Sequence, residues 1–349
     1  MSRWVVLVVL VACGLLAGAA SAQEGDPSTE PAEGSAIHAE GFEESGLSLE
    51  AESGASDTSE PFDPATATEA YLAQLTPEQR ERSDSYFEGG YWLQLWGFLY
   101  GLGVAWLLLA KRLSAKMRDL GEKVSRFKPV QTAVYAVQYV LLSTVLGFPL
   151  TVYQGFYREH QYDLATQTFG AWFGEQMIGL VIGLVLMPIL LVILYGVFRR
   201  APRTWWLWGA GVALVFLVLM LLISPVFIAP LFNDYVALED PAVVEPILSM
   251  ARSNGVAVDN VYQFDASRQS TRVSANVSGI FGTMRISLND NLLERCDLAG
   301  VRAVMGHEIG HYVLNHIYES ILFFGVVLVL GFAFVRFTYD RILACCGER

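Results

Sequence analysis

Residues 301–316 read VRAVMGHEIGHYVLNH, and this segment carries the strongest structural signal in the chain. His307 and His311 are four residues apart, so on an α-helix both imidazoles project from one face and can hold a single ion. Glu308 lies one step round from His307, where its carboxylate can take a proton from water instead of ligating. The spacing predicts a metal-binding helix with two ligands and a base. The alternative is a buried helix whose histidines satisfy hydrogen bonds within a core.

The composition favours a membrane protein. Hydrophobic residues make up 53% of the 349 residues and charged residues only 17%, a balance typical of a chain largely embedded in lipid. About 20 helical residues are needed to cross a bilayer. Apolar segments of this kind are predicted near residues 91–110, 130–156, 176–198, 204–230 and 320–337.

The first 64 residues divide into two parts. Residues 1–22 hold an apolar run that ends in Ala-Ser-Ala, which predicts a secretory signal peptide, with lipoprotein processing at Cys13 or an uncleaved anchor as alternatives. Residues 23–64 contain twelve acidic side chains and no Lys or Arg, so we expect a disordered acidic linker. This linker accounts for the formal net charge of −12. The rest is close to neutral, and no nucleic-acid partner is expected.

Basic residues predict the orientation in the membrane. They gather between the first and second spans, between the third and fourth spans, and after the last span. All three groups lie on one side if every span crosses, and the positive-inside rule makes that side the cytoplasm. The polar block at residues 231–319 would then face outward.

The metal helix resembles that of a known family. GHEIGHYVLNH is similar to the zinc helix of the integral-membrane zinc metalloproteases of the CAAX prenyl protease (type I) kind, in which Trp and a later His follow HExxH. Tyr312 stands at the Trp position and His316 at the later His. His316 is interpreted as structural, because on a continuous helix it lies about half a turn off the ligand face. Three further segments extend the likeness to about residues 80–320: REHQYDLATQT at 158–168, SPVFIAPLF at 224–232 and RISLNDNLL at 285–293.

The resemblance implies a fold class that is mainly α, a polytopic helical membrane protein with a small α+β, zincin-like metalloprotease domain carrying HExxH. The expected parts are an N-terminal membrane domain with four transmembrane helices at 65–230, the metalloprotease domain at 231–319, and a final transmembrane helix with a short tail at 320–349. Within 231–319, hydrophobic patterning predicts a helix over 240–252 and strands near 256–264, 273–277 and 284–288.

The resemblance also implies a function, a membrane-embedded zinc-dependent endopeptidase. Zn²⁺ would be held by His307 and His311, with Glu308 as the catalytic base. An edge strand near Ala275 and Asn276 would bind a peptide or protein substrate by β-augmentation. The expected substrates are prenylated or misfolded membrane-associated proteins. The cleavable leader and the outward acidic tail favour a bacterial inner membrane as the location. The family usually turns its metal domain toward the cytosol, which conflicts with the charge pattern.

The third zinc ligand is the open question. A catalytic zinc normally has three protein ligands, and the resemblance implies a Glu on a later helix in an ExxxD-like pattern. No such pattern follows His316. Three interpretations stay open: a chain truncated at its C-terminus, a carboxylate borrowed from Glu319, Asp290 or elsewhere, or a catalytically inactive membrane protein that only binds partners.

Overall fold

The computed structural model describes residues 64–73, 75–279 and 284–346. The signal peptide expected at 1–22 and almost all of the linker expected at 23–64 lie outside these residues. Contacts divide the chain into two compact units, and among the described residues the division falls between Trp92 and Leu93. The described part of the smaller unit, Glu30–Trp92, holds α2 (Pro64–Leu72) and the start of α3 (Pro77–Ala110). Helix α3 begins with a capping box, in which Thr76 and Gln79 exchange side-chain to backbone hydrogen bonds of 3.2 and 2.9 Å.

Among the described residues, five helices are long and apolar enough to cross a membrane. Each overlaps one of the apolar segments predicted from the sequence. They are Pro77–Ala110, Lys128–Gln161, Phe169–Arg200, Trp205–Leu231 and His316–Tyr339. The second comprises α5 (Lys128–Val152), the π-helix η1 (Tyr153–Tyr157) and α6 (Arg158–Gln161); the third is α7 (Phe169–Arg200). The fourth comprises α8 (Trp205–Ile223), η2 (Ser224–Ile228) and η3 (Ala229–Leu231), and the fifth lies within α12 (His316–Cys346).

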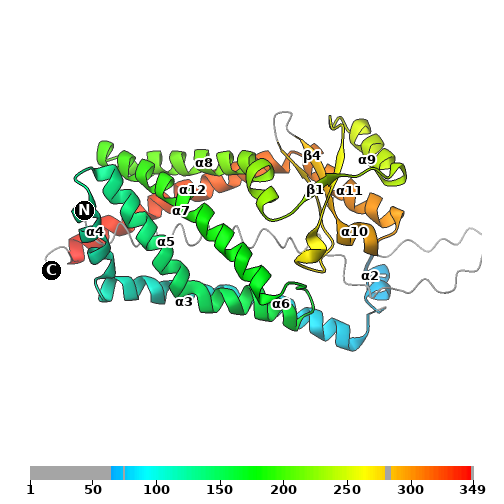
Figure 1. The fold of residues 1–349 in the computed structure, drawn as a ribbon, viewed down its shortest axis with the longest axis horizontal. Helices are drawn as coiled ribbons and strands as arrows, with labels where there is room; N and C mark the ends of the chain where they lie inside the picture. Colours follow the sequence, from blue (N-terminus) through cyan, green and yellow to red (C-terminus); the bar gives the residue numbers. More distant parts are fainter. Residues whose placement is uncertain (1–63, 74, 280–283, 347–349) are drawn as a thin grey trace, which may run out of the picture. The chain divides into compact units, whose positions relative to one another are not determined.

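Helices α5, α7, α8 and α12 share a buried apolar cluster, in which α8 and α12 run side by side (Figure 1). Leu194 on α7 and Ala210 on α8 are almost fully buried there, beside Phe332 on α12. The close approach of α8 to α12 requires Gly209, because a Cβ at this position would lie 2.7 Å from the ring of Phe332. A larger residue at this position would force the ring of Phe332 to move.

The basic segment between the first two spans forms an additional helix, α4 (Leu113–Val124). Its buried positions Ser114, Met117 and Gly121 recur at helical spacing. This face packs on α5, where the Ser114 hydroxyl lies 2.9 Å from the hydroxyl of Tyr135. The basic side chains lie on the exposed face, so α4 is an amphipathic helix with a positively charged outer surface.

The polar block contains a four-stranded sheet in the order β1-β2-β4-β3. The strands are β1 (Tyr235–Ala237), β2 (Val261–Phe264), β3 (Ala275–Ser278) and β4 (Arg285–Asn289). β1 pairs antiparallel with β2, β2 parallel with β4, and β3 antiparallel with β4. The prediction missed the short β1 and began β2 too early, since Val256 and Val258 are buried but precede the ladder.

Three helices lie beside this sheet (Figure 1): α9 (Pro241–Ser253), α10 (Asp290–Arg295) and α11 (Leu298–Val313). Asp240 caps α9 by accepting a 2.9 Å hydrogen bond from the Ala242 N–H, and its predicted apolar face is buried at Ile247, Leu248 and Ala251. These side chains join β2, β4, α10 and α11 in one core. The structure therefore confirms the predicted fold class, a polytopic helical protein with a small α+β domain.

Candidate metal centre

Helix α11 carries the HExxH motif and is anchored by its opposite face. Asp297 caps the helix, its Oδ1 accepting a 2.7 Å hydrogen bond from the Gly300 N–H. Val301, Met305 and Ile309 follow at intervals of four residues, and each is at most 2% exposed. This buried row packs against the sheet and fixes the rotation of the helix about its axis.

That rotation places the two predicted ligands away from the core. His307 is exposed and His311 is half-buried. Their Nε2 atoms lie 2.9 Å apart, and the ring planes are perpendicular. Two nitrogen ligands at about 2.0–2.1 Å from a tetrahedral zinc would be separated by about 3.3 Å, close to the observed spacing. Because His307 is exposed and His311 only half-buried, the pair does not match the alternative of two histidines inside a core.

His316 completes a row of three imidazoles. Its Nδ1 lies 2.6 Å from the Nδ1 of His311. On one continuous helix, as expected from the sequence, His316 would point away from the ligand face. The helix instead ends at Val313, and Asn315 adopts a left-handed conformation with φ of 60° before α12 begins at His316. This turn brings the His316 ring back onto His311.

The contact between His311 and His316 bears on the protonation of the ligand ring. Two Nδ1 atoms at 2.6 Å require one donor and one acceptor. When the Nδ1–H of His311 donates, its Nε2 keeps the lone pair that a metal requires. His316 is then the acceptor and carries its own proton on Nε2. The geometry therefore suits His316 for holding His311 in the ligating tautomer.

Glu308 is half-buried on α11, between the two histidines in sequence. Strand β3 packs against the same helix and is an edge of the sheet. No strand in the described part of the chain pairs with its other side. The Asn289 N–H donates a 2.9 Å hydrogen bond to the Ser274 carbonyl, which sets the alternation of the β3–β4 ladder. By this alternation the backbone of Asn276 bonds to β4, whereas the N–H and C=O of Ala275 and Val277 point to the open edge.

Side-chain amides fix the entry into β3. Asn289 accepts from the Ser274 N–H at 3.1 Å and donates to the Arg272 carbonyl at 2.7 Å. Asn291 donates to the carbonyls of Ser270 and Arg272 at 2.8 and 3.0 Å. Both amides are buried, so each hydrogen bond forms in a region of low dielectric. The backbone leading into the edge strand is therefore held firmly.

The same segment is attached to the loop between α6 and α7. Arg272 forms a 2.9 Å ion pair with Glu159, and Ser270 forms a β-bridge with Ala165. Gln269 donates to the carboxylate of Glu175 on α7 at 2.9 Å. These contacts join the edge strand to the membrane helices. Residues 158–168, one of the segments that carry the family resemblance, supply much of this attachment.

Comparisons with known proteins identify the family of this chain. The profile of the CAAX prenyl protease N-terminal region, described by its five membrane helices, matches residues 64–234. The profile of peptidase family M48 matches residues 237–343, which include the HExxH helix. The chain belongs to peptidase family M48. The resemblance inferred from the zinc helix is thereby confirmed, and the chain is a membrane protein of the CAAX prenyl protease kind.

The chain is also similar to individual members of the family. The chain is 29% identical to an uncharacterized metalloprotease of Bacillus subtilis, over 70% of this chain and 58% of that protein. It is 31% identical to CAAX prenyl protease 1 of Saccharomyces cerevisiae, over 57% of this chain and 45% of that protein. The crystal structure of S. mikatae Ste24p shares the fold, with a TM-score of 0.65, 24% identity, and coverage of 78% of this chain and 64% of that one. The chain thus spans about half the length of these two curated relatives.

The two imidazoles of α11 fit two of the ligands of a zinc ion in chemistry and spacing. In the described ranges, no group of three His, Cys, Asp or Glu side chains is placed to hold a metal. Asp290, considered as a borrowed ligand, uses its carboxylate to accept hydrogen bonds from Ser267 and Asn291. Glu319 is exposed on the first turn of α12. Neither carboxylate forms a three-ligand group with the histidines.

Proposed function

We propose that this protein is a zinc-dependent endopeptidase that acts at the membrane. The observation that carries the proposal is the pair of convergent imidazoles, His307 and His311, on a helix packed against an open sheet edge. A metal helix beside an edge strand can place an extended backbone next to the ion. Membership of a peptidase family supports the same reaction class.

Each residue of the site has a distinct role. His307 and His311 would hold the zinc through Nε2, and His316 would keep the His311 ring in place. Zinc, when bound, supplies a Lewis acid for the peptide carbonyl and for the attacking water. The Glu308 carboxylate accepts a proton from that water and returns it to the nitrogen of the leaving amine.

Strand β3 supplies the proposed substrate site. The outward N–H and C=O groups of Ala275 and Val277 can pair with an extended peptide, so binding depends on main-chain shape more than on side chains. The backbone of Asn276 forms hydrogen bonds to β4, so this residue would keep β3 in place in the sheet. The yeast relative is named a CAAX prenyl protease. Prenylated C-termini and misfolded membrane-associated proteins are accordingly the substrate classes that we propose.

A non-catalytic binding protein is the second candidate. It is favoured by the absence of a three-ligand group among the described residues. Such a protein would keep the open edge of β3 for binding partners and would have no use for a base at Glu308. Metal content and cleavage, measured on the same sample, distinguish the two candidates.

Glu308→Gln is the deciding variant, with Glu319→Gln as a matched control on the exposed start of α12. We expect Glu308→Gln to retain zinc and to lose peptide cleavage by about 10²–10⁴-fold, the usual contribution of a general base. Glu319→Gln should match the unmodified protein. Zinc is measured by elemental analysis, and cleavage with a farnesylated peptide and its unprenylated counterpart. Full zinc loading without cleavage by the unmodified chain would favour the binding protein.

We further propose that residues 231–319 face outward from a bacterial inner membrane. Support comes from the three groups of basic residues, which all fall on the opposite side when each of the five apolar helices crosses. A reporter fused near Glu245, an exposed residue of α9, tests the orientation. Activity typical of a cytoplasmic reporter would reverse the proposed topology.

A further inference from the structure

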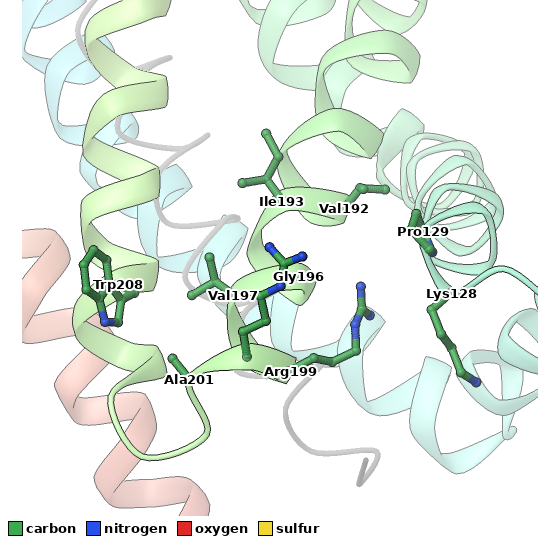
Figure 2. A pocket seen from close by; sticks show the side chains of 10 residues that line it. Lys128, Pro129, Val192, Ile193, Gly196, Val197, Arg199, Ala201 and Trp208 are labelled. Atoms are coloured by element: carbon green, nitrogen blue, oxygen red, sulfur yellow. The ribbon is translucent and has the colours of Figure 1, made fainter.

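A cavity of about 790 Å³ lies at the end of the helix bundle where α5 begins and α7 ends (Figure 2). Its charged lining residues are Lys128, Arg199 and Arg200, and none of the described residues that line it is acidic. Lys128 donates a 3.2 Å hydrogen bond to Gln131. Within the described residues, no carboxylate forms an ion pair with Arg199 or Arg200. The cavity therefore holds three positive charges and suits an anion.

The remaining wall of the cavity is apolar. Ile193 and Val197 on α7 and Trp208 on α8 border it (Figure 2). Ile193 is 47% exposed and Trp208 is 62% exposed, so these side chains contact the surroundings of the bundle. A site that is cationic at one end and apolar along its side matches an amphiphile better than a soluble ion. Its volume also falls within the range of about 300–1,000 Å³ typical of sites for organic ligands.

The position of the cavity agrees with this chemistry. Helix α7 ends at Arg200 and α8 begins at Trp205, so the cavity lies at the end of two apolar helices. Arginine and tryptophan at helix ends are typical of the level at which lipid headgroups meet hydrocarbon. Basic pockets between membrane helices at this level bind anionic headgroups.

We propose that this cavity binds an anionic phospholipid, with its phosphate between Lys128, Arg199 and Arg200 and its acyl chains against Ile193, Val197 and Trp208. The site is separate from the metal centre on α11. Lipid binding at this site does not depend on the proposed peptidase activity. Lipid binding can therefore be measured on protein with or without zinc.

Filling the cavity tests the proposal without changing charge. Gly196 lines the cavity, and a Cβ at this position would meet no atom within 4 Å. Gly196→Leu should occupy the space and leave the helix intact, because leucine favours helix more than glycine. Gly179→Leu is the matched control, since Gly179 lies on the same helix, also has nothing within 4 Å of a Cβ, and does not line the cavity.

Removing charge is the second test. Arg199→Gln combined with Arg200→Gln should weaken binding of the anionic lipid about 25-fold, at about fivefold for each basic residue. Lys116→Gln combined with Lys123→Gln removes the same charge from the exposed face of α4, outside the cavity. This control should leave the bound lipid unchanged.

The assay uses the full chain in nanodiscs of phosphatidylglycerol and phosphatidylcholine, with retained lipid counted by native mass spectrometry. The proposal predicts that the unmodified chain retains phosphatidylglycerol selectively. This retention should be lost in Gly196→Leu and in the arginine double variant, and kept in both control variants. Equal losses in the two charge variants would show general attraction to the membrane surface and overturn it. Retention by Gly196→Leu would overturn it as well. Displacement of the lipid by inorganic phosphate alone would identify a soluble-anion site instead.

Discussion

His316→Ala should weaken zinc binding by about tenfold. The substitution removes a 2.6 Å contact to His311, which as one neutral hydrogen bond contributes about 1 kcal/mol, or about fivefold in affinity. Loss of the restraint on the His311 ring adds to this effect, and partners of metal-bound histidines typically contribute about 10–100-fold. Because both rings are only half-buried, we expect the lower end of that range.

The assay is competition for zinc between the purified chain and a chromophoric chelator. His316→Asn should recover part of the affinity, since its amide oxygen can accept the same hydrogen bond. Tyr318→Ala alters an exposed side chain near the start of the same helix and should have no effect. In the metal-free protein, nitrogen chemical shifts of His311 should report a proton on Nδ1 that is lost in His316→Ala. Unchanged affinity in His316→Ala, or equal losses in all three variants, would refute a positioning role for this ring.

Three further predictions concern the surrounding scaffold. Ala275→Pro removes an N–H that points to the open edge and should lower kcat/KM about tenfold. Asn276→Pro instead removes a backbone hydrogen bond to β4 and should lower the thermal unfolding midpoint. Unchanged cleavage by Ala275→Pro would contradict substrate binding at this edge. Asn315→Gly should preserve zinc affinity, while Asn315→Val should cost about 1–2 kcal/mol in stability because a β-branched residue resists positive φ, which chemical denaturation measures. The ion pair of Glu159 and Arg272 is partly exposed and should give at most about 1 kcal/mol of coupling in a double-mutant cycle of unfolding.

Features within one element were predictable from sequence. His307, Glu308 and His311 lie on one helix, so their relative positions follow from helical geometry. The apolar helices were predictable for the same reason, because length and hydropathy are local properties. Strand β3 was located from its pattern near Ala275, although its place at the sheet edge followed from the family resemblance.

Features that depend on how elements meet were missed or left open. The contact of His316 with His311 depends on the left-handed residue Asn315, and asparagine is one of the few residues that adopt this conformation readily. Helix α4 was missed because its basic residues were interpreted for orientation alone, although its amphipathic spacing was present. A third zinc ligand would come from a different element, and helical periodicity on α11 carries no information about it.

The junction at Leu314 and Asn315 has a consequence for how this protein tolerates insertions and deletions. It joins the motif helix directly to a helix that is long and apolar enough to cross a membrane. Each residue added at the start of α12 would rotate the following side chains by about 100° around the helix axis. Phe332 would then leave its place against Gly209, or His316 would leave His311. Length changes should therefore be rare at this point among natural variants.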